Sequence, residues 1–138
     1  PEWQNEDEEQ IKENRNRQIL LVDDTAFFRM IEAEYLESAG YSVIVAENGQ
    51  QALDMLDKHP VDAVVLDIIM PVMDGWNTIR AIRNDNRFSE LPVLAVTSLA
   101  DEQSREKGLA AGFTAWESKL NKEMLLSRLE SMLLQTVS

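Results

Sequence analysis

The chain of 138 residues is long enough for one domain with a single core and too short for two substantial ones. It contains no cysteine, which excludes disulfide frameworks and thiolate metal sites, and its net charge of -12 at pH 7 argues against nucleic acid as a direct partner. A hydrophobic fraction of 44% without an apolar run of membrane-spanning length predicts a globular cytoplasmic domain that makes no membrane contact itself.

Residues 1–17 are polar and acidic, with Trp3 and Ile11 as the large apolar residues. Such a segment cannot bury enough apolar surface to form a core element, so we interpret it as a linker, with a frayed helix as the alternative. The chain begins at Pro1 without a methionine, which suggests either a piece of a longer polypeptide or a chain trimmed at its start. We therefore place the folded domain at residues 18–138.

From Gln18 onward, short apolar runs alternate with segments of helical period. The runs predict strands over 18–22, 41–46, 61–67, 91–98 and 113–118. The periodic segments predict helices over 26–39, 50–58, 74–85, 101–111 and 121–135. Because a helix between two strands is the usual crossover between parallel neighbours, the pattern predicts an α/β fold with a doubly wound five-stranded parallel sheet.

Charged and hydroxyl side chains follow the predicted strands. Asp23 and Asp24 follow the first strand, Asp67 the third, Thr97 the fourth and Lys119 the fifth. Ligands of doubly wound sheets bind beyond these strand ends, so we expect the five side chains to converge. Three carboxylates repel one another unless a cation such as Mg²⁺ joins them, and an ammonium and a hydroxyl beside a metal suit phosphoryl transfer onto a carboxylate.

Four stretches carry a resemblance to a known family. They are LLVDDTAFFR (20–29), VVLDIIMPVMDG (64–75), VLAVTS (93–98) and ESK (117–119). In this order, over Gln18 to about Gln135, they resemble the receiver domain of response regulators in two-component signalling. The resemblance implies a flavodoxin-like sheet of strand order 2-1-3-4-5. It also implies a domain that takes a phosphoryl group from a histidine kinase or histidine phosphotransfer domain and catalyses its own phosphorylation and dephosphorylation, not the turnover of a separate substrate.

The same resemblance assigns roles to individual residues. Asp67 would accept the phosphoryl group, and Asp24, Asp67 and the backbone carbonyl of Ile69 would bind Mg²⁺, with Asp23 acting through water. Lys119 would contact the phosphoryl group. Thr97 would move to hydrogen-bond it and, with the aromatic residue at position 116, would form a switch.

The sequence departs from the family at two places. Lys119 is followed by Leu120 instead of proline, which predicts a different loop before the last helix. Trp116 stands where the family commonly has tyrosine or phenylalanine, so it is either a switch or a plain packing residue. With DDTAFFR (23–29) and AGFTAW (111–116), these features look most like receivers attached to chemotaxis hybrid kinases or coupling proteins. Such a domain would act as a switch or phosphate sink, and other domains of the parent chain would be further partners.

Two other functions compete with this one. A haloacid-dehalogenase-type phosphohydrolase also uses an aspartate at a strand end, but it needs a second aspartate two residues later, where this chain has Ile69. A degenerate receiver that serves only as a docking module is the other alternative, and the presence of the acidic residues, the threonine and the lysine argues against it.

Three expectations concern neighbouring residues. Arg29 is predicted to face solvent, and Met70 to pack beneath the loop after Asp67. The side chains two positions after Asp67 and Thr97, Ile69 and Leu99, are apolar and cannot hold an attacking water, which predicts a long-lived phosphoryl group.

Overall fold

The computed structural model describes residues 2–119 and 121–135. Its centre is one parallel sheet with the strand order β2-β1-β3-β4-β5, which confirms the predicted flavodoxin-like topology. The strands are β1 (Gln18–Val22), β2 (Ser42–Ala46), β3 (Ala63–Leu66), β4 (Val93–Thr97) and β5 (Ala115–Ser118). The five predicted strands are therefore all present.

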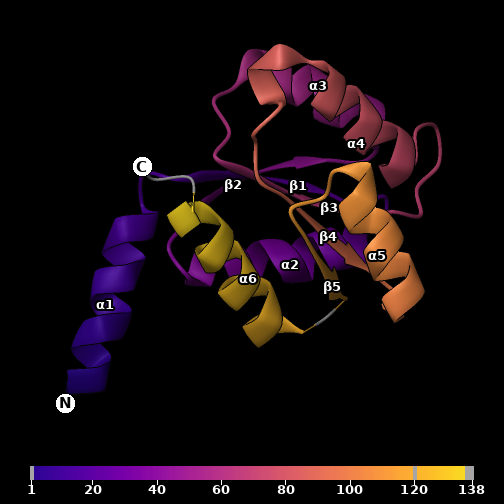
Figure 1. Cartoon of the computed structure of the whole chain (residues 1–138). Helices are drawn as coiled ribbons and strands as arrows, with labels where there is room; N and C mark the ends of the chain where they lie inside the picture. Colours follow the sequence, from indigo (N-terminus) through magenta and orange to yellow (C-terminus); the bar gives the residue numbers. More distant parts are fainter. Residues whose placement is uncertain (1, 120, 136–138) are drawn as a thin grey trace.

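Helices cover both faces of the sheet (Figure 1). The helices of the chain are α1 (Glu2–Asn14), α2 (Ala26–Ser38), α3 (Gly49–Lys58), α4 (Gly75–Asn84), α5 (Glu102–Ala111) and α6 (Lys122–Gln135), with a short 3-10 turn at Asn86–Phe88. Helices α3 and α4 pack on one face, and α2 and α6 pack on the other. None of the described helices is both long and apolar enough to cross a membrane.

The central strands are buried on both faces, which explains their uninterrupted apolar sequences. Along β1, Leu20 and Val22 face the α3/α4 layer, whereas Ile19 and Leu21 face the α2/α6 layer. Met70 lies 8% exposed in the first of these cores, as predicted. This two-sided burial leaves the strand ends as the place where polar side chains gather.

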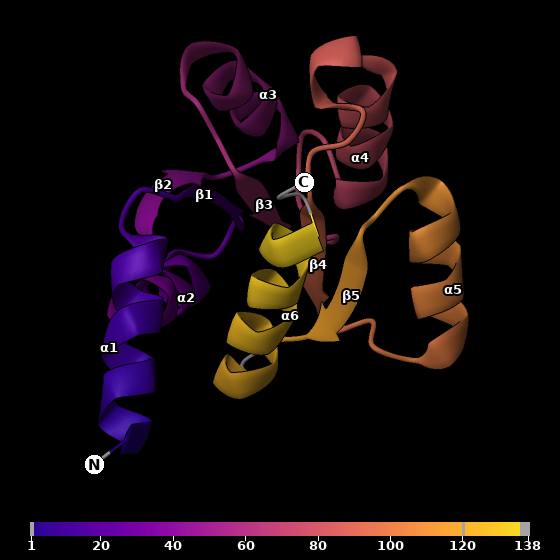
Figure 2. The same ribbon diagram turned by 60° about the vertical axis from the view of Figure 1, so that its left-hand side comes forward.

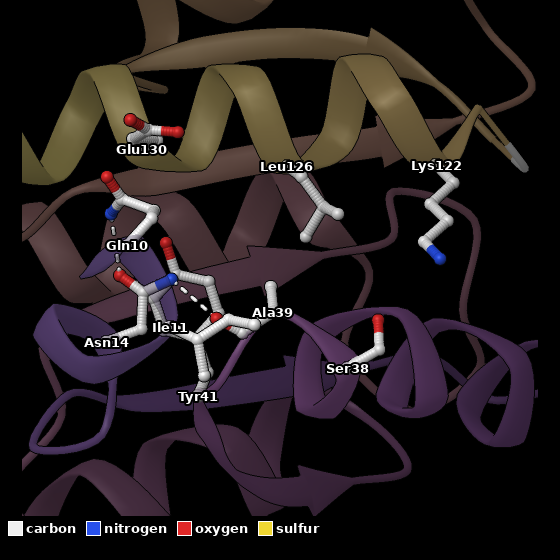
Figure 3. Close-up of a pocket in the computed structure, with 9 residues that line it drawn as sticks. All are labelled: Gln10, Ile11, Asn14, Ser38, Ala39, Tyr41, Lys122, Leu126 and Glu130. Carbon is white, nitrogen blue, oxygen red and sulfur yellow. Dashed lines mark hydrogen bonds between the residues drawn. The ribbon is translucent and has the colours of Figure 1, made fainter. Parts of the chain in front are cut away.

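The segment interpreted as a linker is a helix over most of its length, and its last turn contacts the domain (Figure 2). The buried Asn14 amide donates a 2.7 Å hydrogen bond to the carbonyl of Ala39, at the end of α2 (Figure 3). Gly40 has φ +103°, and a Cβ there would lie 2.5 Å from the carbonyl oxygen of Ile11, so α1 approaches this turn closely. That residues 1–17 act as a linker remains a prediction.

A pocket lies between α1, α2 and α6 (Figure 3). Its lining residues include Ile11, Tyr41 and Leu126, and Lys122 and Glu130 lie at its edge on α6. The carboxylates at the strand ends do not line this pocket. The pocket is therefore separate from the acidic residues at the carboxyl ends of the strands.

Candidate functional site

Three carboxylates meet at the carboxyl ends of β1 and β3. These strands pair in parallel, with Val22 opposite Leu66, so Asp23, Asp24 and Asp67 leave the sheet side by side. One ligand oxygen from each carboxylate lies within 4.8 Å of the other two. Asp23 and Asp67 are 1% and 4% exposed, whereas Asp24 is exposed. The predicted convergence of these carboxylates is confirmed.

Backbone amides fix the two buried carboxylates. The amide of Thr25 donates a 2.9 Å hydrogen bond to Asp23 Oδ1, and the amide of Ile68 donates a 2.8 Å bond to Asp67 Oδ1. The Asp67 amide itself donates to the carbonyl of Val22, which ties the two strand ends together. One oxygen of each carboxylate is thus held by the backbone, and the other is directed at a cation.

Lys119 supplies that cation from the end of β5. Its Nζ lies 3.0 Å from Asp23 Oδ2 and 3.2 Å from Asp67 Oδ2, and its side chain is only 15% exposed. The Lys119 amide donates to the carbonyl of Thr97, which anchors the end of β5 to that of β4. The ammonium also lies 4.2 Å from the centre of the Phe28 ring. Lys119 therefore bridges the buried carboxylates.

The electrostatics of the site favour a cation. Burial raises the pKa of Asp67, the nearby charge of Asp23 raises it further, and Lys119 opposes both effects. Burial alone would lower the pKa of Lys119, but its hydrogen bonds and charge interactions with Asp23 and Asp67 outweigh burial and raise it. Lys119 therefore offsets only part of the effects that raise the pKa of Asp67, and a further cation would favour its carboxylate form.

Glu32 is a buried carboxyl near this site that the sequence analysis missed. It lies on α2, is 2% exposed, and its Oε1 has no hydrogen-bond partner among the described residues. Burial, with the charge of Asp23 next in importance, raises its pKa from 4.5 to about 8, while Lys119 opposes the shift. Its position one helical turn before the buried Leu36 was the available sign that it faces inward.

The prediction that Arg29 faces solvent is wrong. Its side chain is 16% exposed, and its Nη1 donates a 2.8 Å hydrogen bond to the carbonyl of Asp23. Its Nη2 lies 3.5 Å from Glu47, at the end of β2. Because a long side chain can fold back over the start of its own helix, Arg29 closes the edge of the site instead of leaving it.

Thr97 and Trp116 are connected through one loop residue. Thr97 is fully buried, and its Oγ1 accepts a 3.2 Å hydrogen bond from the amide of Leu99. Trp116 is 4% exposed, and its indole Nε1 donates a 2.7 Å hydrogen bond to the carbonyl of the same Leu99. A Cβ at Gly108 on α5 would collide with the indole, so the glycine makes room for it. Trp116 is a packing aromatic, and its action as a switch stays a prediction.

Ile69, two residues after Asp67, is 58% exposed. It offers no carboxyl for the acid or base that a haloacid-dehalogenase-type reaction needs at this position. Leu120, where the predicted change in the loop after Lys119 begins, lies outside the described residues.

The donor set at the strand ends fits Mg²⁺. This ion prefers carboxylate and carbonyl oxygens, and Asp23, Asp24 and Asp67 offer three carboxylates in one place. Two of them are buried, and a backbone amide holds one oxygen of each. The fit rests on the carboxylates, which the sequence predicted correctly as a group.

Comparison with known proteins decides the family. A family model described as the response regulator receiver domain matches residues 19–133. The chain belongs to this family. Receiver domains are the phosphorylatable modules of two-component systems, and the group of acidic residues with a lysine at the strand ends is consistent with such a module.

This receiver domain has relatives of several kinds. It is 37% identical over 116 residues to the transcriptional regulatory protein CpxR of Escherichia coli strain K12, and the match covers 83% of this chain and 48% of CpxR. It is 38% identical over 104 residues to the sensor histidine kinase CheAY of Helicobacter pylori, which covers 73% of this chain and 13% of the kinase. The receiver domain therefore spans less than half the length of either protein.

Among solved structures, the receiver domain is similar to that of the sensor histidine kinase PA1611 from Pseudomonas aeruginosa PAO1. The TM-score is 0.78 at 30% identity, and the match covers 85% of this chain and 97% of the other. That structure holds a magnesium ion coordinated in its active-site cleft.

Proposed function

We propose that this receiver domain takes a phosphoryl group from a phosphohistidine onto Asp67 in a Mg²⁺-dependent reaction. The observation that carries the proposal is the environment of the Asp67 carboxylate. It is buried, fixed by the amide of Ile68, paired with Lys119 Nζ at 3.2 Å, and grouped with two further carboxylates. This arrangement pairs a nucleophile with an ammonium and with a set of ligands for a metal ion.

In the proposed step, an Asp67 oxygen attacks phosphorus in line with the bond to the donor nitrogen. The phosphorus–nitrogen bond breaks, its electron pair stays on the imidazole, and an aspartyl phosphate forms. Asp24, Asp67 and the carbonyl of Ile69 would hold Mg²⁺, with Asp23 acting through water, and a bound ion would supply positive charge to the phosphoryl oxygens. Lys119 orients another phosphoryl oxygen through its ammonium.

Thr97 has a proposed role after transfer. Its hydroxyl accepts a hydrogen bond from the Leu99 amide in this structure. If this hydroxyl turned toward a new phosphoryl oxygen, it would donate a hydrogen bond to that oxygen and would lose its bond with the Leu99 amide. The loop at Leu99, whose carbonyl accepts the hydrogen bond from the Trp116 indole, would then shift. The proposed switch therefore runs from Thr97 through Leu99 to the indole.

The donor would dock on the apolar rim of the site. Five exposed large apolar residues lie on the start of α2 and on the loops after β3 and β4, which follow the carboxyl ends of these strands: Phe27, Met30, Ile69, Val72 and Leu99. Apolar patches of this kind mark interaction surfaces. A histidine kinase or histidine phosphotransfer domain that covers this rim would bring its phosphohistidine in line with Asp67.

We further propose a role in chemotaxis-type signalling, as a switch or phosphate sink within a larger cytoplasmic protein. The similarity to CheAY, a sensor histidine kinase many times longer than this chain, supports a receiver joined to other domains. The helix α1, which docks by its last turn against the α2–β2 turn, would then connect the receiver to such a domain.

The test of the phosphoacceptor is labelling by a small acyl phosphate. With Mg²⁺ present, intact mass should show that one phosphoryl group attaches to the parent domain and none to Asp67→Asn. Asp54→Asn, an exposed change on α3, is the matched control and should label normally. Labelling of Asp67→Asn equal to that of the parent would exclude Asp67, and equal labelling with a chelator present would exclude the metal dependence.

A further inference from the structure

Helix α2 places an aromatic ring against the lysine of the site. The Phe28 ring centre lies 4.2 Å from Lys119 Nζ, within the range at which an aromatic face attracts an ammonium. Lys119 is 15% exposed, so water competes only weakly for its charge. The contact joins residues that are far apart in the sequence.

The position of Phe28 is fixed by the packing of α2. Phe28 and Glu32 lie one helical turn apart on the same face of α2, and Glu32 is buried. The Phe27 ring meets the Phe28 ring edge to face, with 5.6 Å between centres and an interplanar angle of 64°. The Phe28 ring therefore shares the face of α2 that carries the buried Glu32, and it packs against the Phe27 ring.

The ring contact differs from the other contacts of Lys119 in one respect. The two ionic partners of Lys119 are Asp23 and Asp67, and we expect these same groups to engage Mg²⁺ and the phosphoryl group. Both ion pairs of Lys119 would therefore change during the reaction. The Phe28 ring takes no part in those changes. It can keep the ammonium in place while the carboxylates exchange partners.

We propose that Phe28 is a positioning residue that holds Lys119 for phosphoryl transfer through the face of its ring. This inference rests on the proposed function. A lysine side chain has several rotatable bonds, and an ammonium that is already in place spares the transition state the entropy of ordering it. Weakening the ring's attraction should therefore slow phosphorylation without abolishing it.

Ring fluorination tests this role without altering the fold. Phenylalanines with one, two and three ring fluorines, introduced at position 28, progressively remove the negative potential of the ring face while nearly keeping its shape. We expect the rate at saturating acyl phosphate and Mg²⁺ to fall stepwise, to between about fivefold and about thirtyfold below the parent with three fluorines. The same series at Phe88, whose ring centre lies 4.8 Å from the guanidinium carbon of Arg87 on the 3-10 turn before β4, is the matched control and should leave the rate unchanged.

A second readout is spectroscopic. A ring this close should shift the NMR signals of the Lys119 ε-methylene protons, and Phe28→Leu should remove that shift while the circular dichroism spectrum stays unchanged. If Phe28→Leu fails to fold, the fluorinated series carries the test alone, because a flat series at Phe28 overturns the inference.

The outcomes separate the two proposals. A parent domain that labels normally, with rates that do not change along the Phe28 series or that fall equally along the Phe88 series, would overturn the positioning role and leave the proposed function intact. A parent domain that takes up no phosphoryl group would overturn the proposed function and this inference with it.

Discussion

The buried Glu32 should make the stability of this domain depend on pH. Folding places its carboxyl on the inward face of α2, 2% exposed, where burial and then the charge of Asp23 raise its pKa from 4.5 to about 8. Between these two values the unfolded chain releases the Glu32 proton, whereas the folded protein keeps it. The free energy of unfolding therefore falls as the pH rises through this interval and levels off above pH 8.

Glu32→Gln removes this contribution, because an amide does not titrate in this range. The gap between the unfolded and folded pKa values, at about 1.4 kcal/mol per unit, corresponds to roughly 4 kcal/mol between pH 5 and pH 9. We therefore expect the free energy of unfolding of Glu32→Gln to rise by about this amount relative to that of the parent as the pH increases from 5 to 9. A constant cost of about 1–3 kcal/mol for the buried amide shifts the whole curve without changing its slope.

Urea unfolding followed by circular dichroism, at several pH values with a chelator present, measures this difference. Comparing the two proteins at each pH removes the pH dependence that they share. Glu34→Gln, an exposed change on the same helix, is the matched control and should run parallel to the parent. If the curves of Glu32→Gln and the parent also run parallel, the carboxyl of Glu32 is not protonated in the folded protein, and this reasoning is refuted.

Three further predictions follow from the loops around the site. Val72 is 83% exposed and has φ +68°, a left-handed conformation that is unfavourable for a β-branched residue. Val72→Asn should therefore raise the free energy of urea unfolding by about 1 kcal/mol. An unchanged value would show that the loop is unstrained. Trp116→Phe should abolish any change in fluorescence on adding Mg²⁺ or acyl phosphate; a signal that persists would report on Trp76, which stacks on Trp116 at 5.5 Å. Ile69→Asn and Leu99→Glu should each speed the decay of the phosphorylated protein after the donor is removed, because a polar side chain can hold the attacking water; equal decay rates would show that other groups control water access.

The fold could be predicted because its two periods are clear in the sequence. The strands that are buried on both faces read as continuous apolar runs, such as residues 63–66, and the helices α3, α4 and α5 begin at side-chain caps, Asn48, Asp74 and Asp101. Helix α1 was harder to predict because its packing rests on contacts with residues distant in the sequence, such as the hydrogen bond from the Asn14 amide to the carbonyl of Ala39 and the approach of Ile11 to Gly40. No local pattern announces such a contact.

The site was predictable as far as the strand ends determine it. Parallel pairing brings Asp23, Asp24, Asp67 and Lys119 to one edge of the sheet whatever the helices do. The contribution of α2 was not predictable in the same way, because the rotation of a helix about its axis decides which side chains reach the site. That rotation turns Phe28 toward the ammonium, which the sequence alone could not show.

The central claim, that Asp67 accepts the phosphoryl group, is tested most directly by chemical trapping. Borohydride reduces an aspartyl phosphate to homoserine, so the domain can be phosphorylated with an acyl phosphate and Mg²⁺, reduced, digested and mapped by peptide mass. We predict homoserine at position 67 and at no other aspartate. Homoserine at Asp23 or Asp24, or none in a protein that carries the phosphoryl group, would contradict the account.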